Sequence, residues 1–222
     1  MEIAVKNLFM NLYWVVKNPR KLFSLLLEKS DLKETLIILL LAGILNGIFY
    51  ILNLKYLENQ SLGEASNNVF IALYPFTMAL LFLIRGSIGL IIATAWIKIC
   101  FRYLNRDIKS TSIFSIMSYA MVPNLIFSNI FKLLWPDVLV AAHNRGKMEI
   151  LYYKTSLAQL LLNLRETHQK IFLLLKSIEL FGLWSFILAV IAVATMGRLS
   201  FKKSFLIVFL PWFFVMSLIV LA

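Results

Sequence analysis

Five long apolar segments constrain this chain more than any other feature of its sequence. Each approaches or exceeds the ~18 consecutive apolar residues that cross a bilayer as a helix. They cover residues 34–54, 75–101, 113–135, 178–196 and 205–222. With 61% hydrophobic residues and a mean hydropathy of +0.84, the chain has more apolar surface than one soluble core could bury. The sequence therefore predicts an all-α, polytopic membrane helical bundle with five transmembrane spans.

Lys and Arg residues near the span ends predict the orientation, because cytoplasmic connections retain positive charge. Residues 1–33, the connection between spans two and three, and the turn between spans four and five are basic. Their cations are Lys6, Lys17, Arg20, Lys21, Lys29, Lys33, Lys98, Arg102, Arg106, Lys109, Arg198, Lys202 and Lys203. We therefore expect a cytoplasmic N-terminus and an outside C-terminus. Residues 136–177 fall outside and carry six further Lys and Arg residues, but long loops follow the rule less strictly.

The net charge of +11 points to anionic lipid headgroups as the counter-charge. Nucleic acid is not expected, because the cations are spread over the span ends rather than gathered on one folded face. A single cysteine, Cys100, excludes an internal disulfide or a cysteine metal cluster. Residues 1–33 lack the pattern of a cleaved signal peptide, so the first span is expected to stay in the membrane.

No Pro/Gly/Ser-rich linker divides the chain, which predicts one domain over residues 1–222. Its parts are 1–33 (cytoplasmic interfacial helices), 34–135 (spans one to three), 136–177 (an amphipathic extracytoplasmic segment) and 178–222 (spans four and five). Within the first part, Asn18 and Pro19 predict the start of a second helix, since Asn caps helices and Pro fits the first turn. These helices either lie at the headgroups or pack against the cytoplasmic ends of the spans.

Residues 136–177 predict an outer helical segment. From Met148 onward apolar residues recur at three- and four-residue spacing, which is typical of an amphipathic helix. Such helices would lie on the outer membrane surface or over the bundle, and a heptad-like seam for a partner helix is the alternative.

Arg85 is the most costly residue of the predicted spans. It lies ten residues after Pro75, and at ~1.5 Å per residue it is about 25 Å from Arg102, in the outer half of its span. Arg at the bilayer centre costs roughly 2.5–3.5 kcal/mol on insertion scales. Three interpretations stay open: snorkelling to the headgroups, an ion pair with Glu179 at the outer end of the fourth span, or a ligand site. Asn124 and Ser128 complete this candidate polar pair or ligand site.

Small and polar residues mark two helix surfaces. Gly43, Asn46 and Gly47 form a candidate helix-packing face in the first span, for packing inside the bundle or for a homo-oligomer. In the third span Pro123 removes a backbone donor and predicts a kink, with Asn124 and Ser128 available to satisfy the freed groups.

Motifs for catalysis are missing from the sequence. It contains no GxxxxGK[ST], HExxH or GxSxG pattern, and Arg85-Gly86-Ser87-Ile88-Gly89 has the wrong spacing for the last of these. We therefore expect no enzyme activity, no cofactor and no metal site.

Three short stretches, in order, resemble the Yip (Ypt/Rab-interacting protein) membrane family, in its prokaryotic branch. They are Asn18-Pro19-Arg20-Lys21-Leu22-Phe23, then Ser118-Tyr119-Ala120-Met121-Val122-Pro123, then Leu183-Trp184-Ser185 with Gly197-Arg198-Leu199-Ser200. The resemblance implies five spans, a cytoplasmic N-terminus and no catalysis. Eukaryotic members are similar to adaptors that bind small GTPases, but this chain lacks their long polar N-terminal domain, so that activity is not carried over.

The sequence thus predicts a non-enzymatic interaction or accessory subunit for other membrane proteins in the inner membrane of a bacterium or archaeon. The resemblance implies an ABC-type export complex as one such partner. A small transporter or lipid-handling protein, with a polar cavity around Arg85, is the alternative.

Overall fold

The computed structural model describes residues 2–52, 68–134, 139–144, 147–153 and 179–221. Helices and two short strands follow in the order α1 (Glu2–Lys17), α2 (Pro19–Glu28), α3 (Leu32–Leu52), α5 (Asn68–Tyr103), α6 (Ser110–Ala120), the π-helix η1 (Pro123–Phe127), α7 (Ser128–Leu134), β1 (Leu139–Asn144), β2 (Lys147–Tyr153), α10 (Leu180–Gly197) and α11 (Phe201–Leu221).

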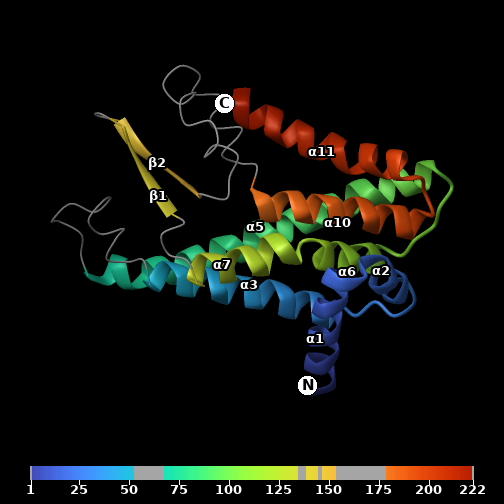
Figure 1. Ribbon diagram of the computed structural model, residues 1–222, viewed down its shortest axis with the longest axis horizontal. Helices are drawn as coiled ribbons and strands as arrows, with labels where there is room; N and C mark the ends of the chain where they lie inside the picture. The colour runs from blue at the N-terminus through green and yellow to red at the C-terminus, as the bar shows by residue number, and fades with distance from the viewer. Residues whose placement is uncertain (1, 53–67, 135–138, 145–146, 154–178, 222) are drawn as a thin grey trace.

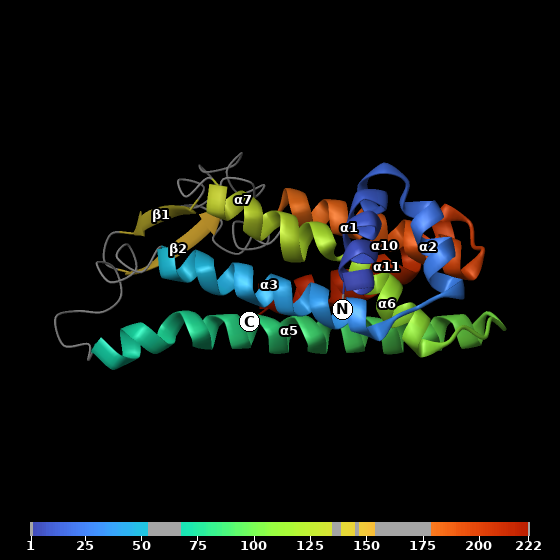
Figure 2. The same ribbon diagram turned by 90° about the horizontal axis from the view of Figure 1, so that it is seen from below.

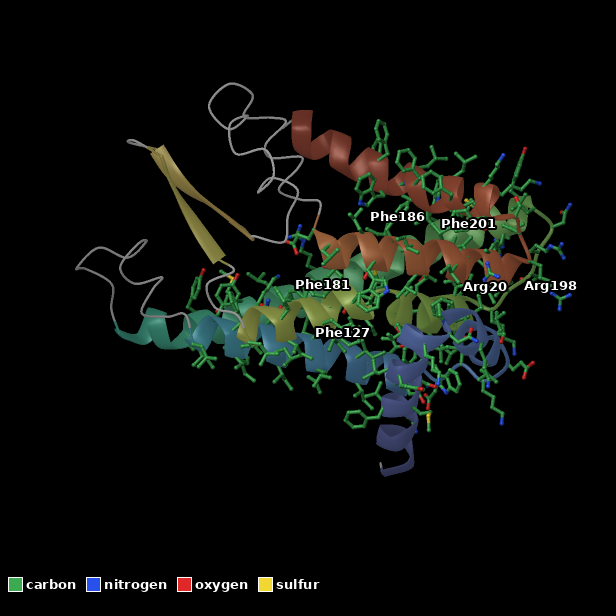
Figure 3. All side chains as sticks on the ribbon, viewed as in Figure 1. Arg20, Phe127, Phe181, Phe186, Arg198 and Phe201 are labelled. Carbon is green, nitrogen blue, oxygen red and sulfur yellow. The ribbon has the colours of Figure 1, made fainter. Side chains whose placement is uncertain are left out.

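The long helices form a bundle along one axis, and α1 lies across it. In Figures 1 and 2, α3, α5, α7 and α10 run lengthwise, whereas α1 is crosswise in both views. The α5–α6 connection, the α10–α11 turn and α2 all lie at one end, which we call the basic end. Figure 3 shows Arg20 and Arg198 together there. The three basic segments of the sequence thus meet in space.

The structure confirms a helical bundle with apolar helices of membrane-spanning length. Among the residues that the structure describes, three helices are long and apolar enough to cross a bilayer, namely α3, α10 and residues Leu73–Tyr103 of α5. The segments Ser110–Ala120 and Pro123–Leu134 would make a fourth span as a bent pair. The predicted fifth span corresponds to α11, which is not among these candidates, so the count of five stays a prediction.

Helix α5 begins earlier than the sequence pattern predicted. It starts at Asn68 and continues through Pro75, which lies inside the helix. Pro75 is the eighth residue of this helix, so it removes one interior backbone hydrogen bond, a loss that membrane helices tolerate. The extension adds about two turns at the end of α5 that lies away from the basic end.

Pro123 bends the third apolar segment, as the sequence predicted. The two halves meet at 43°, and residues Pro123–Phe127 between them adopt a π-helix. A proline removes one backbone donor and pushes the preceding turn open. At the bend the Asn124 amide donates to Ser185 Oγ of α10 at 3.0 Å. The kink is therefore fastened to a neighbouring helix.

The second N-terminal helix, α2, packs against the core of the bundle. Asn18 caps α2 by accepting from the Lys21 amide at 3.2 Å, and Pro19 occupies its first turn, so the predicted helix start is confirmed. Leu22 and Phe23 of α2 are fully buried, and α2 packs against α6 and α10. Of the two alternatives for this segment, α2 takes the one in which the helix packs against the span ends.

Residues 139–144 and 147–153 form strands, which corrects the prediction of an amphipathic helix at the residues that follow Met148. Strands β1 and β2 pair antiparallel, with Leu139 opposite Tyr153 and Asn144 opposite Lys147. Ile150, Leu151, Tyr152 and Tyr153 form a compact apolar and aromatic run of the kind that favours strands, and Asn and Gly between the two runs favour a hairpin. Residues 154–178, where the rest of that prediction falls, lie outside the described residues.

Candidate functional site

A buried carboxylate at the basic end is the centre of the candidate site. Glu34, in the first turn of α3, is only 7% exposed. The Tyr119 hydroxyl of α6 donates to Glu34 Oε2 at 2.6 Å, and Asn11 Nδ2 of α1 donates to the same oxygen at 3.0 Å. Asn11 Nδ2 also lies 3.1 Å from the Tyr119 hydroxyl oxygen. One oxygen of Glu34 thus joins three helices, α1, α3 and α6, which we call the Glu34 cluster.

The position of Glu34 along the sequence explains why α3 accommodates a charge there. The N-terminal turn of a helix carries unpaired amides and a partial positive charge, which favour a carboxylate. Asp31 contributes to the same helix start by accepting from the Lys33 amide at 2.8 Å. In the described part of the chain no Lys or Arg pairs with Glu34, so its charge depends on hydrogen-bond donors. Such charge-assisted hydrogen bonds are stronger than neutral ones.

Hydroxyl groups extend the polar contact between α3 and α6. Thr35 and Ser118 are both fully buried, and their hydroxyl oxygens lie 3.1 Å apart. Ser118 Oγ donates to the Ser115 carbonyl at 2.7 Å. In an apolar environment these groups pair with each other because no water is available. They fix the register of α6 against α3, next to the Glu34 cluster.

An ion pair between Lys98, near the end of α5, and Asp107 holds the connection between α5 and α6. Lys98 Nζ lies 2.8 Å from Asp107 Oδ1. The hydrogen bond and charge of Lys98 hold the pKa of the Asp107 carboxyl below its usual value. This contact is present when the carboxyl is ionised and is lost as the pH falls through that lowered pKa. Asp107 is fully exposed, so the pair positions the loop rather than stabilising the core.

The predicted residues around Arg85 do not come together. The Arg85 side chain is exposed on α5, which packs mainly against α3 and α6. Glu179 precedes α10 at the far end of the bundle, where its charge acts on Lys132 of α7. Glu179 is thus close enough to influence Lys132 electrostatically, and no ion pair joins it to Arg85 among the residues that the structure describes.

Asn124 and Ser128 lie at the bend of the third apolar segment. Ser128 is buried at 1% exposure, whereas the Asn124 side chain is exposed. The contact described above uses the backbone amide of Asn124. Neither residue lies with Arg85 in the described contacts.

Two glycines of the predicted packing face lie against α5. A Cβ added at Gly43 would be 2.6 Å from Leu83 Cγ, and one at Gly47 would be 3.2 Å from Ala79 Cβ. Asn46 of the same face is partly buried. The missing side chains allow α3 and α5 to approach closely inside the bundle.

Sequence reasoning missed the Glu34 cluster. In the sequence Glu34 is only the first residue of the first predicted span, and neither Asn11 nor Tyr119 is among the candidate site residues. One signal was available, because a Tyr within an apolar run needs a hydrogen-bond partner for its hydroxyl when it is buried. The partner itself was not predictable, since the contacts span 85 and 23 residues of sequence.

No group of three or more His, Cys, Asp or Glu side chains suited to a metal ion occurs among residues that the structure describes. The chemistry that the Glu34 cluster offers is hydrogen bonding to one carboxylate.

Comparison with known proteins gives one match. A family model described as the Yip1 domain matches residues 14–222. The chain belongs to the Yip1 domain family. Neither the curated proteins nor the solved structures contain a match.

The Yip1 domain match places the Glu34 cluster in context. Glu34 and Tyr119 lie within the matched residues, and Asn11 precedes them. The match also covers all three stretches on which the resemblance rested. Asn11, which donates to the buried Glu34 carboxylate, thus lies in the part of α1 that precedes the matched residues.

Proposed function

We propose that this Yip1 domain protein is a non-enzymatic accessory subunit that binds other membrane proteins in the cytoplasmic membrane of a bacterium or archaeon. An export complex of the ABC type is the partner that the prokaryotic resemblance suggests. Family membership and the apolar helices support a membrane role. The adaptor role is inferred from the exposed surface of the bundle.

The exposure of α5 carries this proposal. Within an apolar 18-residue stretch of α5 only 6% of the residues are buried inside the bundle, compared with 39% for α3 and 44% for α10. Its outer side presents large apolar residues, including Leu81, Ile88 and Ile92, which are 53%, 51% and 61% exposed. Large exposed apolar surfaces mark sites that contact lipid or another protein. Helix α5 is therefore the available docking side of the bundle.

The basic end supports a cytoplasmic N-terminus and contact with anionic lipids. Lys21 Nζ lies 4.4 Å from the ring centroid of Trp14, and Lys17 Nζ lies 5.2 Å from that of Tyr13. Aromatic rings beside cations are typical of the headgroup layer. With α1 crosswise to the bundle, these residues suit a helix at the surface of a membrane with negative headgroups.

Cysteine labelling tests this orientation. In a Cys100→Ser background, an impermeant maleimide should label Glu149→Cys in intact cells and Arg106→Cys only after the membrane is opened. The physical reason is that Arg106 lies in the basic end and Glu149 in the hairpin at the opposite end. Labelling of Arg106→Cys in intact cells, with Glu149→Cys protected, would reverse the orientation.

Native purification tests the proposed function. Extraction of the tagged protein directly from its membrane into nanodiscs, followed by mass spectrometry, should recover a second membrane protein in a fixed ratio to this one. An unrelated multi-pass protein of the same abundance, purified in parallel, is the control for chance capture. Recovery of the protein alone under several mild conditions would contradict an accessory role.

The transport alternative gains no support from the described contacts. It requires Arg85, Asn124, Ser128 and Glu179 around one cavity, and these residues are distributed over the exposed side of α5, the bend at Pro123 and the start of α10.

A further inference from the structure

Arg85 lies near the middle of Leu73–Tyr103, the part of α5 that is long and apolar enough to span a membrane. Tyr74, which contacts Tyr50 edge to face at the far end of the bundle, precedes Arg85 by 11 residues, and Lys98 at the basic end follows it by 13. At ~1.5 Å per residue these separations are about 16 Å and 20 Å. A hydrocarbon layer ~30 Å thick places its centre ~15 Å from either surface. A bilayer whose two surfaces lie near Tyr74 and Lys98 would therefore place Arg85 close to its centre, and the Arg85 side chain is shorter than either distance.

Arg85 also faces away from the bundle. The inner side of α5 is marked by Leu90, Ile97 and Phe101, which are almost fully buried. Leu81, Arg85, Ile88 and Ile92 follow one another at three- and four-residue spacing on the other side and are all exposed. Residues with this spacing share one helix face. The charge thus stands in the centre of the apolar outer face of α5.

Gly89 makes the same region accessible to another helix. It lies one turn after Arg85 and is exposed, and a Cβ placed on it would meet no atom within 4 Å. A missing side chain lets the backbone of a second membrane helix approach closely. Leu81, Arg85, Ile88, Gly89 and Ile92 together form what we call the Arg85 face.

The charge of Arg85 specifies the chemistry of what covers this face. An Arg at the bilayer centre is costly unless a carboxylate, a lipid phosphate or water accompanies it. The apolar helices that the structure describes do not supply the carboxylate. Glu34 is the only acidic residue in the sequence of α3, α5, α6, α7, α10 and α11, and it lies at the basic end in its own cluster. The same helices of a second copy therefore offer no acidic side chain at the depth of Arg85.

We propose that the Arg85 face binds a membrane-spanning helix of a different protein, and that this helix carries an Asp or Glu near the bilayer centre. The pairing would compensate the charge of Arg85 in lipid, and Gly89 would admit the partner backbone. This inference rests on the proposed accessory function and names the binding surface and the chemistry of the partner.

A designed peptide tests the recognition directly. The probe is a Leu-rich transmembrane peptide with one central Glu, and its matched control carries Gln at that position. Energy transfer between labelled full-length protein and peptide in phosphatidylcholine vesicles should report association with the Glu peptide. Association should fall about tenfold or more with the Gln peptide or with Arg85→Gln, since polar pairs hold membrane helices together. Gly89→Leu should also weaken it, whereas Ile187→Leu on α10 should not.

Three results would overturn the proposal. The first is equal association of the Glu and Gln peptides. The second is an unchanged signal with Arg85→Gln. The third is found when phosphatidylglycerol is added to the vesicles: the Glu and Gln peptides then associate equally, and the wild type retains this lipid whereas Arg85→Gln does not. This result would show that Arg85 binds a lipid phosphate. A thermal unfolding midpoint unchanged by Arg85→Gln shows that the variant is folded.

Native purification separates this inference from the function on which it rests. Equal recovery of a partner by the wild type and by Arg85→Gln overturns the Arg85 face and leaves the accessory role intact. Both proposals are supported if the wild type, but not Arg85→Gln, recovers a partner that has a carboxylate near the centre of a membrane helix. Exchanging the two charged residues between the proteins should then restore the recovery. Failure of the wild type to recover any partner overturns both.

Discussion

Tyr119→Phe is expected to lower the free energy of unfolding by about 1.5–3 kcal/mol, the range for hydrogen bonds to charged groups. The substitution removes only the hydroxyl that donates to Glu34 at 2.6 Å, and the carboxylate stays buried with one fewer donor. Steric trapping or thermal unfolding in one bilayer mimic would measure the change. Tyr103→Phe is the matched control, because Tyr103 is 89% exposed, and it should have little effect.

A double-mutant cycle shows whether the loss of stability in Tyr119→Phe comes from the hydrogen bond to Glu34. Glu34→Gln keeps the size of the side chain but removes its charge, so Tyr119→Phe should cost less in that background. We expect a coupling free energy above ~0.5 kcal/mol between the two positions. Simple additivity would show that Tyr119 acts through packing rather than through the carboxylate.

Gly197→Ala is expected to destabilise the bundle by about 1–3 kcal/mol, the usual cost of overpacking a filled core. A Cβ at Gly197 of α10 would lie 2.7 Å from Phe101 Cε1 and 2.9 Å from Leu199 Cγ. Phe101 of α5 is fully buried, so its ring has little room to move. Thermal unfolding in the same bilayer mimic would measure the cost.

Gly182→Ala is the control for Gly197→Ala, because it makes the same change on the same helix. A Cβ at Gly182 meets nothing within 4 Å, so alanine there should be neutral or should stabilise α10 by up to about 1 kcal/mol through its helix propensity. Phe101→Leu should recover part of the loss caused by Gly197→Ala. Equal effects of the two alanine substitutions would contradict the close packing of the Phe101 ring against Gly197.

Local chemistry made parts of the fold predictable from the sequence. The cap at Asn18, the helix start at Pro19 and the bend at Pro123 depend on residues that are adjacent in the chain, and all three are present. The apolar segments at α3 and α10 fall within two residues of their predicted limits. The Yip1 family was recognisable because its short motifs occur in the right order.

The features that the sequence did not predict depend on contacts between residues that are distant in the chain. The Glu34 cluster joins three helices, and no local pattern indicates which donor reaches a carboxylate. The start of α5 at Asn68 was not predicted, because Pro75 indicated a boundary and the helix continues through it. Glu179 could be placed at the outer end of a span, but its electrostatic partner Lys132 depends on the packing of α7 beside α10. The pairing of β1 and β2 was missed because their apolar residues also fit a helical spacing.

Photo-crosslinking from within the membrane tests the central claim that one side of this bundle is a docking surface. A benzophenone amino acid would replace Ile88, which belongs to the Arg85 face, or Ile187 of α10, which is exposed to the same extent at 51%. Irradiation of intact cells should give a protein adduct from position 88 that disappears with Arg85→Gln, and lipid adducts alone from position 187. Lipid adducts alone from both positions, or a protein adduct at 88 that is indifferent to Arg85, would contradict the account.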